Sequence, residues 1–309
     1  REGPAVHLGA AAGSLLGQRA GLDGRDLRTL VGCGVAAAIA ATFNTPLAGV
    51  VFAMEVVLME YSLAGFLPVI VAAVAGAAVG QLAFGDALSL PVGTLPAAGV
   101  RELPAVVAAG VVLGTLAATF SGLLLRIAGT TRPWPWPARL FAGGLATAAA
   151  GLVMPEVMGL GYDTIARAVA GDYGAGPLLA IAVLKLLATA AAIGCGLPGG
   201  LIGPTLVMGA AAGGVLGMAG AVLAPALVPA PGLCALLGAG AMMGATLQAP
   251  LAALTALFEM TGNPHVVLPG MLAIVTACLV SRELHGRDSI FHAQMRAAGL
   301  RYHAPGLAH

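Results

Sequence analysis

Charged residues are scarce in this sequence. Of its 309 residues only 9% are Asp, Glu, Lys or Arg, and none of these lies between Lys185 and Glu259. A solvated surface of ordinary composition would not leave so long an uncharged gap, so the composition excludes a soluble globular protein. The formal net charge of +1 provides no basic surface, and no nucleic-acid partner is expected.

Cysteine is rare, and histidine shows no ligand spacing. The four cysteines are scattered through apolar segments, and we expect reduced, packed thiols at Cys33, Cys195, Cys234 and Cys278. No metal and no cofactor are predicted. The chain has neither a His-Glu-x-x-His helix nor a Gly-x-Ser-x-Gly turn. An intramembrane enzyme is therefore only a remote alternative, and no enzymatic activity is predicted.

The sequence also lacks a starting methionine and a signal-peptide pattern. It begins at Arg1, inside a motif described below, and we expect N-terminal helices of the first half of the fold to be missing. After about Arg301 the tail is too short to build a core of its own, so no soluble domain is predicted.

Apolar residues make up 59% of the chain and fall into separate segments. They cover roughly 4–17, 29–43, 46–61, 65–84, 103–127, 138–154, 176–195, 204–228, 232–247, 250–261 and 266–281. Ala, Leu, Gly and Met dominate, and two-residue alternation is absent, so the segments predict membrane helices rather than a barrel. Several are shorter than the roughly 20 residues that a perpendicular crossing needs. The surface connections are expected at Asp86–Glu102, Arg132–Pro137 and Pro155–Ala175.

Two parts of the chain repeat one another. Pro4–Gly17 aligns with Pro204–Gly217 without a gap, with Pro, Ala-Ala-Ala-Gly and Leu-Gly coinciding. In each part a glycine then stands twelve residues before Pro-Leu-Ala, and a glutamate, Glu55 or Glu259, follows nine residues after that proline. The pattern predicts a first repeat over 1–127, a Pro/Trp linker over 128–137 and a second repeat over 138–309.

The starts of the two repeats have the features of an anion site. Glu2 precedes Gly3-Pro4, a suitable beginning for a helix whose free N–H groups and dipole attract a negative charge. The matching break, Gly194–Pro204, is rich in glycine and carries no charge, so its amides would hold an anion weakly enough to release it. Transporters built from two repeats bind substrate where such helix starts converge near the midplane.

With these features the sequence resembles the CLC family of chloride channels and proton-coupled chloride exchangers. The resemblance rests on several ordered stretches and runs through essentially the whole chain. They are Arg1–Pro4, Phe43–Gly49, Gly200–Pro204, Ala249–Leu251 with Phe258–Gly262, and Asp288–Phe291. The resemblance implies an all-α membrane bundle of tilted and interrupted helices in two inverted halves. It also implies a homodimer whose contact face comes from residues 46–84 and 250–281. A multi-pass protein of a prokaryotic inner membrane is expected.

The resemblance also implies residue roles. Glu2 would be the gating glutamate, whose carboxylate competes with chloride for an anion position. The chloride or similar small anion would be bound by groups at Gly3, Leu201, Ile202, Gly203 and Phe291. A serine-bearing motif that bears on anion selectivity in the family has no counterpart here, so selectivity is not predicted.

Two departures bear on coupling. Phe291 stands where the family usually has a tyrosine, so a hydroxyl donor is lost from the inner anion site. Val56 stands where proton-coupled members typically carry a second glutamate, and valine cannot carry a proton. These departures favour a passive chloride channel, with a proton-coupled exchanger as the alternative, because Glu60 lies one helical turn beyond Val56. A non-conducting remnant is a more remote possibility.

Three further ionisable residues lie in apolar segments, where each needs a reason. We favour a structural role for Glu55 and Glu259, as hydrogen-bonded carboxylates that tie the repeat together, over a proton path. Lys185 is expected to extend to a membrane surface, with attraction of anions in an aqueous vestibule as the alternative.

Overall fold

A computed structural model of the protein describes residues 2–85, 90, 92 and 95–299, and all regular structure within these residues is helical. Arg1, the predicted tail after Arg301 and much of the first half of the predicted connection Asp86–Glu102 lie outside the described residues. The helices form two compact units, which are treated one at a time below.

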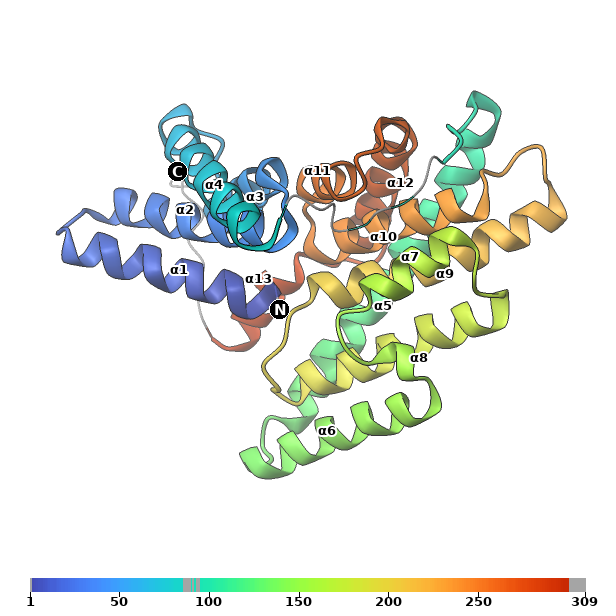
Figure 1. Ribbon diagram of the computed structural model, residues 1–309. Helices are drawn as coiled ribbons and strands as arrows, with labels where there is room; N and C mark the ends of the chain where they lie inside the picture. Colours follow the sequence, from blue (N-terminus) through green and yellow to red (C-terminus); the bar gives the residue numbers. More distant parts are fainter. Residues whose placement is uncertain (1, 86–89, 91, 93–94, 300–309) are drawn as a thin grey trace. The chain divides into compact units, whose positions relative to one another are not determined.

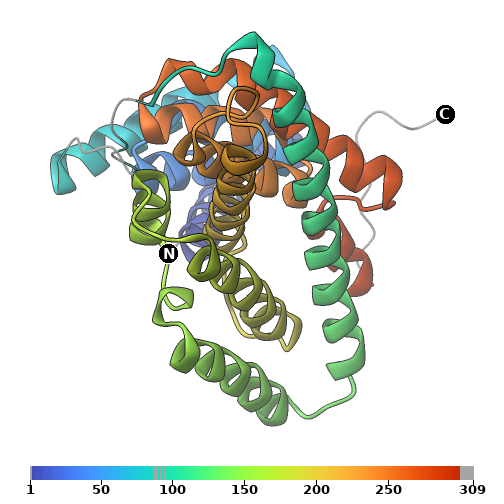
Figure 2. The ribbon, with the colours of Figure 1, turned by 90° about the vertical axis from the view of Figure 1, so that its right-hand side faces the viewer.

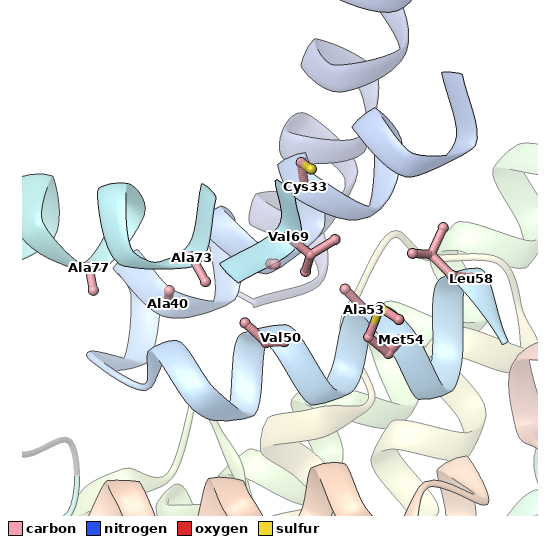
Figure 3. Close-up of a cluster of buried hydrophobic side chains, with 10 residues drawn as sticks. Cys33, Ala40, Val50, Ala53, Met54, Leu58, Val69, Ala73 and Ala77 are labelled. Carbon is pink, nitrogen blue, oxygen red and sulfur yellow. The ribbon is translucent and has the colours of Figure 1, made fainter. Parts of the chain in front are cut away.

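The first unit contains α1 (Glu2–Arg19), α2 (Gly24–Phe43), α3 (Pro46–Phe52), the π-helix η1 (Ala53–Leu58), α4 (Leu63–Phe84) and α11 (Pro250–Thr261). The α-helices of this unit are labelled in Figure 1. Its core is an apolar cluster from α2, α3, η1 and α4. Figure 3 shows small side chains such as Ala40, Ala53 and Ala73 in this cluster beside Met54 and Val69. Small side chains let the helix backbones approach closely, as membrane helices require.

The second unit contains α5 (Leu103–Thr131), α6 (Trp136–Val153), α7 (Tyr162–Ala170), α8 (Ala175–Gly194), α9 (Ile202–Leu223), α10 (Pro231–Leu247), α12 (Val267–Leu279) and α13 (Ile290–Ala297). Short helices join these: η2 (Val100–Glu102), η3 (Pro155–Val157), η4 (Pro264–Val266) and η5 (Val280–Leu284). In Figure 2, α5 is the long green helix. It packs against α8, α10 and α12.

Each unit contains the same helix crossing. A side chain at Gly9 of α1 would overlap the carbonyl oxygen of Gly34 in α2, and the reverse also holds. Gly209 of α9 and Gly238 of α10 are related in the same way. These are the glycines that the repeat pairs with one another. The all-helical fold with a duplicated arrangement is therefore confirmed at the level of individual contacts.

The turns after these crossings also match. Asn44 and Gln248, each two residues before the proline that begins the next short helix, have left-handed backbones with φ of 56° and 53°. Such a conformation ends a helix and redirects the chain. In the first unit the side chain of Gln81 donates to Asn44 Oδ1 at 2.8 Å, which holds this turn.

Helix positions agree with the apolar segments except in the connections. The predicted connection Pro155–Ala175 contains α7, whose buried residues Thr164, Ile165, Ala168 and Val169 lie on one face. Nine residues are too few for the apolar pattern of a membrane span, so the sequence did not reveal this helix. Helices α5 and α6 extend into the predicted linker 128–137 and leave only 132–135 between them.

Within the described residues, six helical stretches are long and apolar enough to cross a membrane: 24–43, 63–84, 100–131, 175–194, 202–223 and 264–284. Three shorter apolar stretches, 46–58, 231–247 and 250–261, accompany them. The protein is a multi-pass integral membrane protein, as the composition predicted.

Candidate functional site

Glu2 begins α1 in the first unit, with Gly3 and Pro4 in the first turn. Its side chain is buried, with 2% of the residue exposed. Because the N-terminal end of a helix carries partial positive charge, a carboxylate at this position is electrostatically favourable. A helix N-terminus attracts negative charge in general, whether it comes from a carboxylate side chain or from a small anion.

The second unit supplies an uncharged helix start. Leu201, Ile202 and Gly203, where α9 begins, are buried. The Thr205 hydroxyl donates to the carbonyl oxygens of Leu201 and Ile202 at 2.8 and 2.9 Å, which fixes the backbone of this turn. The first amides of a helix have no carbonyl partner within the helix, so they can bind other acceptors.

Hydrogen bonds from neighbouring helices hold the first residues of the glycine-rich segment that precedes α9. Thr131 Oγ1 donates to the Gly194 carbonyl at 3.2 Å, and Arg139 Nε donates to the Cys195 carbonyl at 3.0 Å. These contacts come from α5 and α6 of the same unit. Irregular backbone at membrane depth requires such protein partners, because lipid offers no hydrogen bonds.

Phe291 is the second residue of the short helix α13 in the second unit. It is partly buried, and it follows Ile290, which is fully buried. The structure thus places Phe291 in the unit that holds Leu201, Ile202 and Gly203, whereas Glu2 and Gly3 belong to the first unit. A phenyl ring in this position offers no hydrogen-bond donor to an anion.

Glu55 and Glu259 make reciprocal contacts within the first unit. The Glu55 carboxylate accepts hydrogen bonds from the amides of Leu251 and Ala252 at 3.3 and 2.7 Å. The Glu259 carboxylate accepts from the amides of Leu47 and Ala48 at 2.9 and 2.6 Å. The carboxylate of η1, which continues α3, therefore caps the start of α11, and the carboxylate in the last turn of α11 caps the start of α3. Sequence reasoning missed the partner amides, although the equal spacing from proline to glutamate was a signal for them.

Val56 follows Glu55 in η1 and is partly buried. An aliphatic side chain here provides no proton carrier, so any coupled proton must use another group. The carboxylate that precedes it in the chain, that of Glu55, has both oxygens occupied by the amides of α11.

The expectation for Lys185 was wrong. The side chain does not extend to a free surface, because only 3% of the residue is exposed. Its ammonium group donates to the carbonyl oxygens of Val157 and Gly159 at 2.7 and 2.9 Å, in the connection that precedes α7. A buried cation is tolerated when polar groups surround it. The residue is a structural tie within the second unit.

Comparison with known proteins identifies the family. Residues 1–282 match the family described as voltage gated chloride channel. The chain belongs to this family. Within the CLC family, the chain is 35% identical to a Ralstonia nicotianae protein named putative chloride channel protein ClcB-like, over 94% of this chain and 69% of the relative. It is 31% identical to the H(+)/Cl(-) exchange transporter ClcA of Citrobacter koseri, over 93% of this chain and 63% of the relative.

Solved CLC structures share the fold. A slow cyanobacterial Cl-/H+ antiporter superimposes with a TM-score of 0.82 at 22% identity, covering 96% of this chain and 71% of that one. A CLC-type fluoride/proton antiporter gives a TM-score of 0.78 at 25% identity, with coverage of 95% and 72%. The CLC-type helical bundle is thus shown for this chain. The chain spans 63% of the length of the Citrobacter relative and 69% of the Ralstonia one.

Proposed function

We propose that this protein is a CLC-type exchanger that moves chloride across a bacterial inner membrane in exchange for protons. The observation that carries the proposal is the buried Glu2 carboxylate at the start of α1, in a chain of this family. The relatives named as H(+)/Cl(-) exchange transporters favour proton coupling over the passive channel that the sequence favoured.

The proposed mechanism uses two kinds of anion donor. In the first unit the amides near Gly3 are donors for chloride, and in the second unit the charge-free turn of Leu201, Ile202 and Gly203 provides donors that bind an anion weakly enough for release. Glu2 competes with chloride for one position while it is ionised. When the Glu2 carboxylate takes up a proton, the neutral carboxyl group no longer competes with chloride. The side chain then turns toward the opposite side of the membrane and releases the proton there. Phe291 restricts the inner end through its size alone.

A flux measurement tests this function. The protein is reconstituted in liposomes under an outward chloride gradient, and external pH is recorded without a proton gradient. Exchange predicts uphill proton uptake that stops when the chloride gradient is removed. Glu2→Gln should lower proton movement at least tenfold, because a neutral amide cannot carry the proton, and should leave chloride flux that no longer depends on pH.

The second candidate is passive chloride conduction. Val56 favours it, since the position holds no acid, and the Ralstonia relative carries a channel name. Chloride flux with no coupled proton movement in the unaltered protein would support this candidate and contradict the exchanger. Unchanged pH dependence in Glu2→Gln would remove Glu2 from either mechanism.

A further inference from the structure

An apolar groove lies in the second unit between α5, α9 and α10, and α12 contributes one residue to its floor. Its volume is about 270 Å³, and its lining consists of Ala, Val, Leu, Gly and Pro residues together with Cys234. A bound water molecule needs two to four polar neighbours, which such a lining does not offer. The groove therefore suits an apolar occupant.

The groove is closed on one side and open on the other. Val106, Leu113 and Leu237 form part of its floor and are buried, whereas Val112 and Leu223 on its rim are 49% and 84% exposed. α5 and α9 belong to stretches that are long and apolar enough to cross a membrane. The open side therefore faces the hydrocarbon of the bilayer, where the acyl chains of lipids can enter it.

Small residues make the space that the groove occupies. Arg101, Ala105, Ala108 and Val112 follow one another at intervals of four, three and four residues in the helical stretch 100–131, so they lie along one face of it. On the opposite wall Gly220 leaves room for Val228, whose side chain a methyl group at Gly220 would overlap. Larger aliphatic side chains at the alanine positions would fill the groove from within the protein.

Arg101 lies at the end of this stripe, one helical turn before Ala105, and it is exposed. Among the described residues no ion pair or side-chain hydrogen bond holds its guanidinium group. The neighbouring Glu102 carboxylate accepts a hydrogen bond from the Gly99 amide at 3.0 Å and so caps η2. An arginine at the end of an apolar helix lies at the membrane boundary, where the phosphates of lipids are found. Its planar group can donate two parallel hydrogen bonds to a phosphate.

We propose that this groove binds one phospholipid, with an acyl chain between α5, α9 and α10 and with the phosphate on Arg101. The chain supplies the packing contacts that the alanines and Gly220 leave out. The arginine supplies the charge that selects a phosphate headgroup. This lipid site does not depend on whether transport is coupled to protons.

A lipid titration tests the acyl-chain part of the proposal. The protein is freed of lipid in detergent and titrated with palmitoyl-oleoyl phosphatidylglycerol, and native mass spectrometry records the lipid bound. Val112→Trp should weaken binding about tenfold, because the indole ring takes the place of several methylene groups. Val111→Trp is the matched control, since Val111 is the adjacent valine, is 40% exposed and does not line the groove. It should leave the affinity unchanged.

A second pair of variants tests the headgroup contact. Arg101→Gln should weaken binding of the same lipid about fivefold, because a charged hydrogen bond to phosphate is lost. Arg101→Lys should retain most of the affinity. Arg126→Gln is the control, since Arg126 is an exposed arginine near the other end of α5. A glycolipid with the same acyl chains and no phosphate should bind the unaltered protein as weakly as phosphatidylglycerol binds Arg101→Gln.

Each departure from these results contradicts a stated part of the proposal. Equal affinities of Val111→Trp and Val112→Trp for phosphatidylglycerol overturn the groove as the binding site. Equal affinities for the glycolipid and phosphatidylglycerol overturn the role of Arg101. Unchanged lipid binding in Val112→Trp together with a shift to monomers shows that a second copy of the chain fills the groove, which also overturns the proposal.

Ala108→Leu keeps the test valid if Val112→Trp does not fold. Ala108 lines the groove from an exposed position, so leucine is tolerated there and narrows the groove. This variant should weaken phosphatidylglycerol binding severalfold. Affinity equal to that of the unaltered protein would overturn the site.

Discussion

Lys185 has its ammonium group inserted between two backbone carbonyls of the connection before α7. Lys185→Met keeps an unbranched chain of similar size but leaves those carbonyls without this donor. Because unsatisfied buried polar groups are costly, we expect the free energy of unfolding to fall by about 2 kcal/mol. Thermal unfolding in detergent measures this change.

The matched control for this variant is Leu187, which is exposed on the same helix α8. Leu187→Met introduces the same side chain where no buried polar contact is lost, so it should leave stability nearly unchanged. Equal unfolding temperatures for Lys185→Met and Leu187→Met would contradict the structural role of Lys185. The unaltered protein and both variants must be compared at one detergent concentration, since detergent competes with helix packing.

Single residues differ in how far the sequence determines their surroundings. Glu2 could be placed at a helix start because its neighbours Gly3 and Pro4 are adjacent in the chain. The partners of Lys185 are 26 and 28 residues away, so their contact depends on how α8 packs against the connection. The sequence showed a lone charge at Lys185 but led to the wrong expectation of a surface position, and neither its burial nor its carbonyl partners could be predicted.

The short helices α3 and α11, together with η1, depend on one another through Glu55 and Glu259. Charge-assisted hydrogen bonds to backbone amides are stronger than neutral ones. Glu259→Gln should lower the free energy of unfolding by about 1–2 kcal/mol, because an amide oxygen is a weaker acceptor and its NH₂ group lies against donors. Glu55→Gln should have a similar effect.

The double variant distinguishes mutual capping from two independent contacts. Once one cap is weakened, the helix starts can separate, and the second cap then contributes less. The Glu55→Gln/Glu259→Gln variant should therefore lose less stability than the sum of the single losses, by at least about 0.5 kcal/mol. Strict additivity in chemical unfolding in detergent would show that the two caps act independently. Glu283→Gln, on an exposed side chain of η5, serves as the control.

Helices could be predicted from the sequence where the apolar segment that encodes them is long. The apolar segments predicted the membrane helices to within a few residues at most ends, since length and composition alone specify a span. α7 was missed because its short apolar face resembles a connection. The π-helical geometry of η1 and η5 is a local packing adjustment that leaves no mark in composition.

At the scale of the whole molecule, the repeat and the family motifs were sufficient to predict the CLC fold. The mode of transport was not fixed by them, because Val56 removes one expected proton carrier without showing whether another replaces it. The apolar groove that Val112 lines brings together residues from α5, α9, α10 and α12. This association required the folded unit, in which segments distant in the chain meet.

Assembly is the remaining property at this scale, and we propose a homodimer whose face comes from 46–84 and 250–281. Val71 of α4 lies in this region and is 69% exposed in the single chain. Val71→Trp should shift the protein toward monomers severalfold, because a bulky ring disrupts a closely packed face. Val222→Trp on α9 is the control, as Val222 is 83% exposed outside these segments and a lipid-facing ring is tolerated.

Subunit counting by photobleaching in dilute liposomes measures the monomer fraction. Equal monomer fractions in the two variants would place the dimer face elsewhere, whereas a selective effect of Val71→Trp would show that α4 contacts a second subunit rather than lipid.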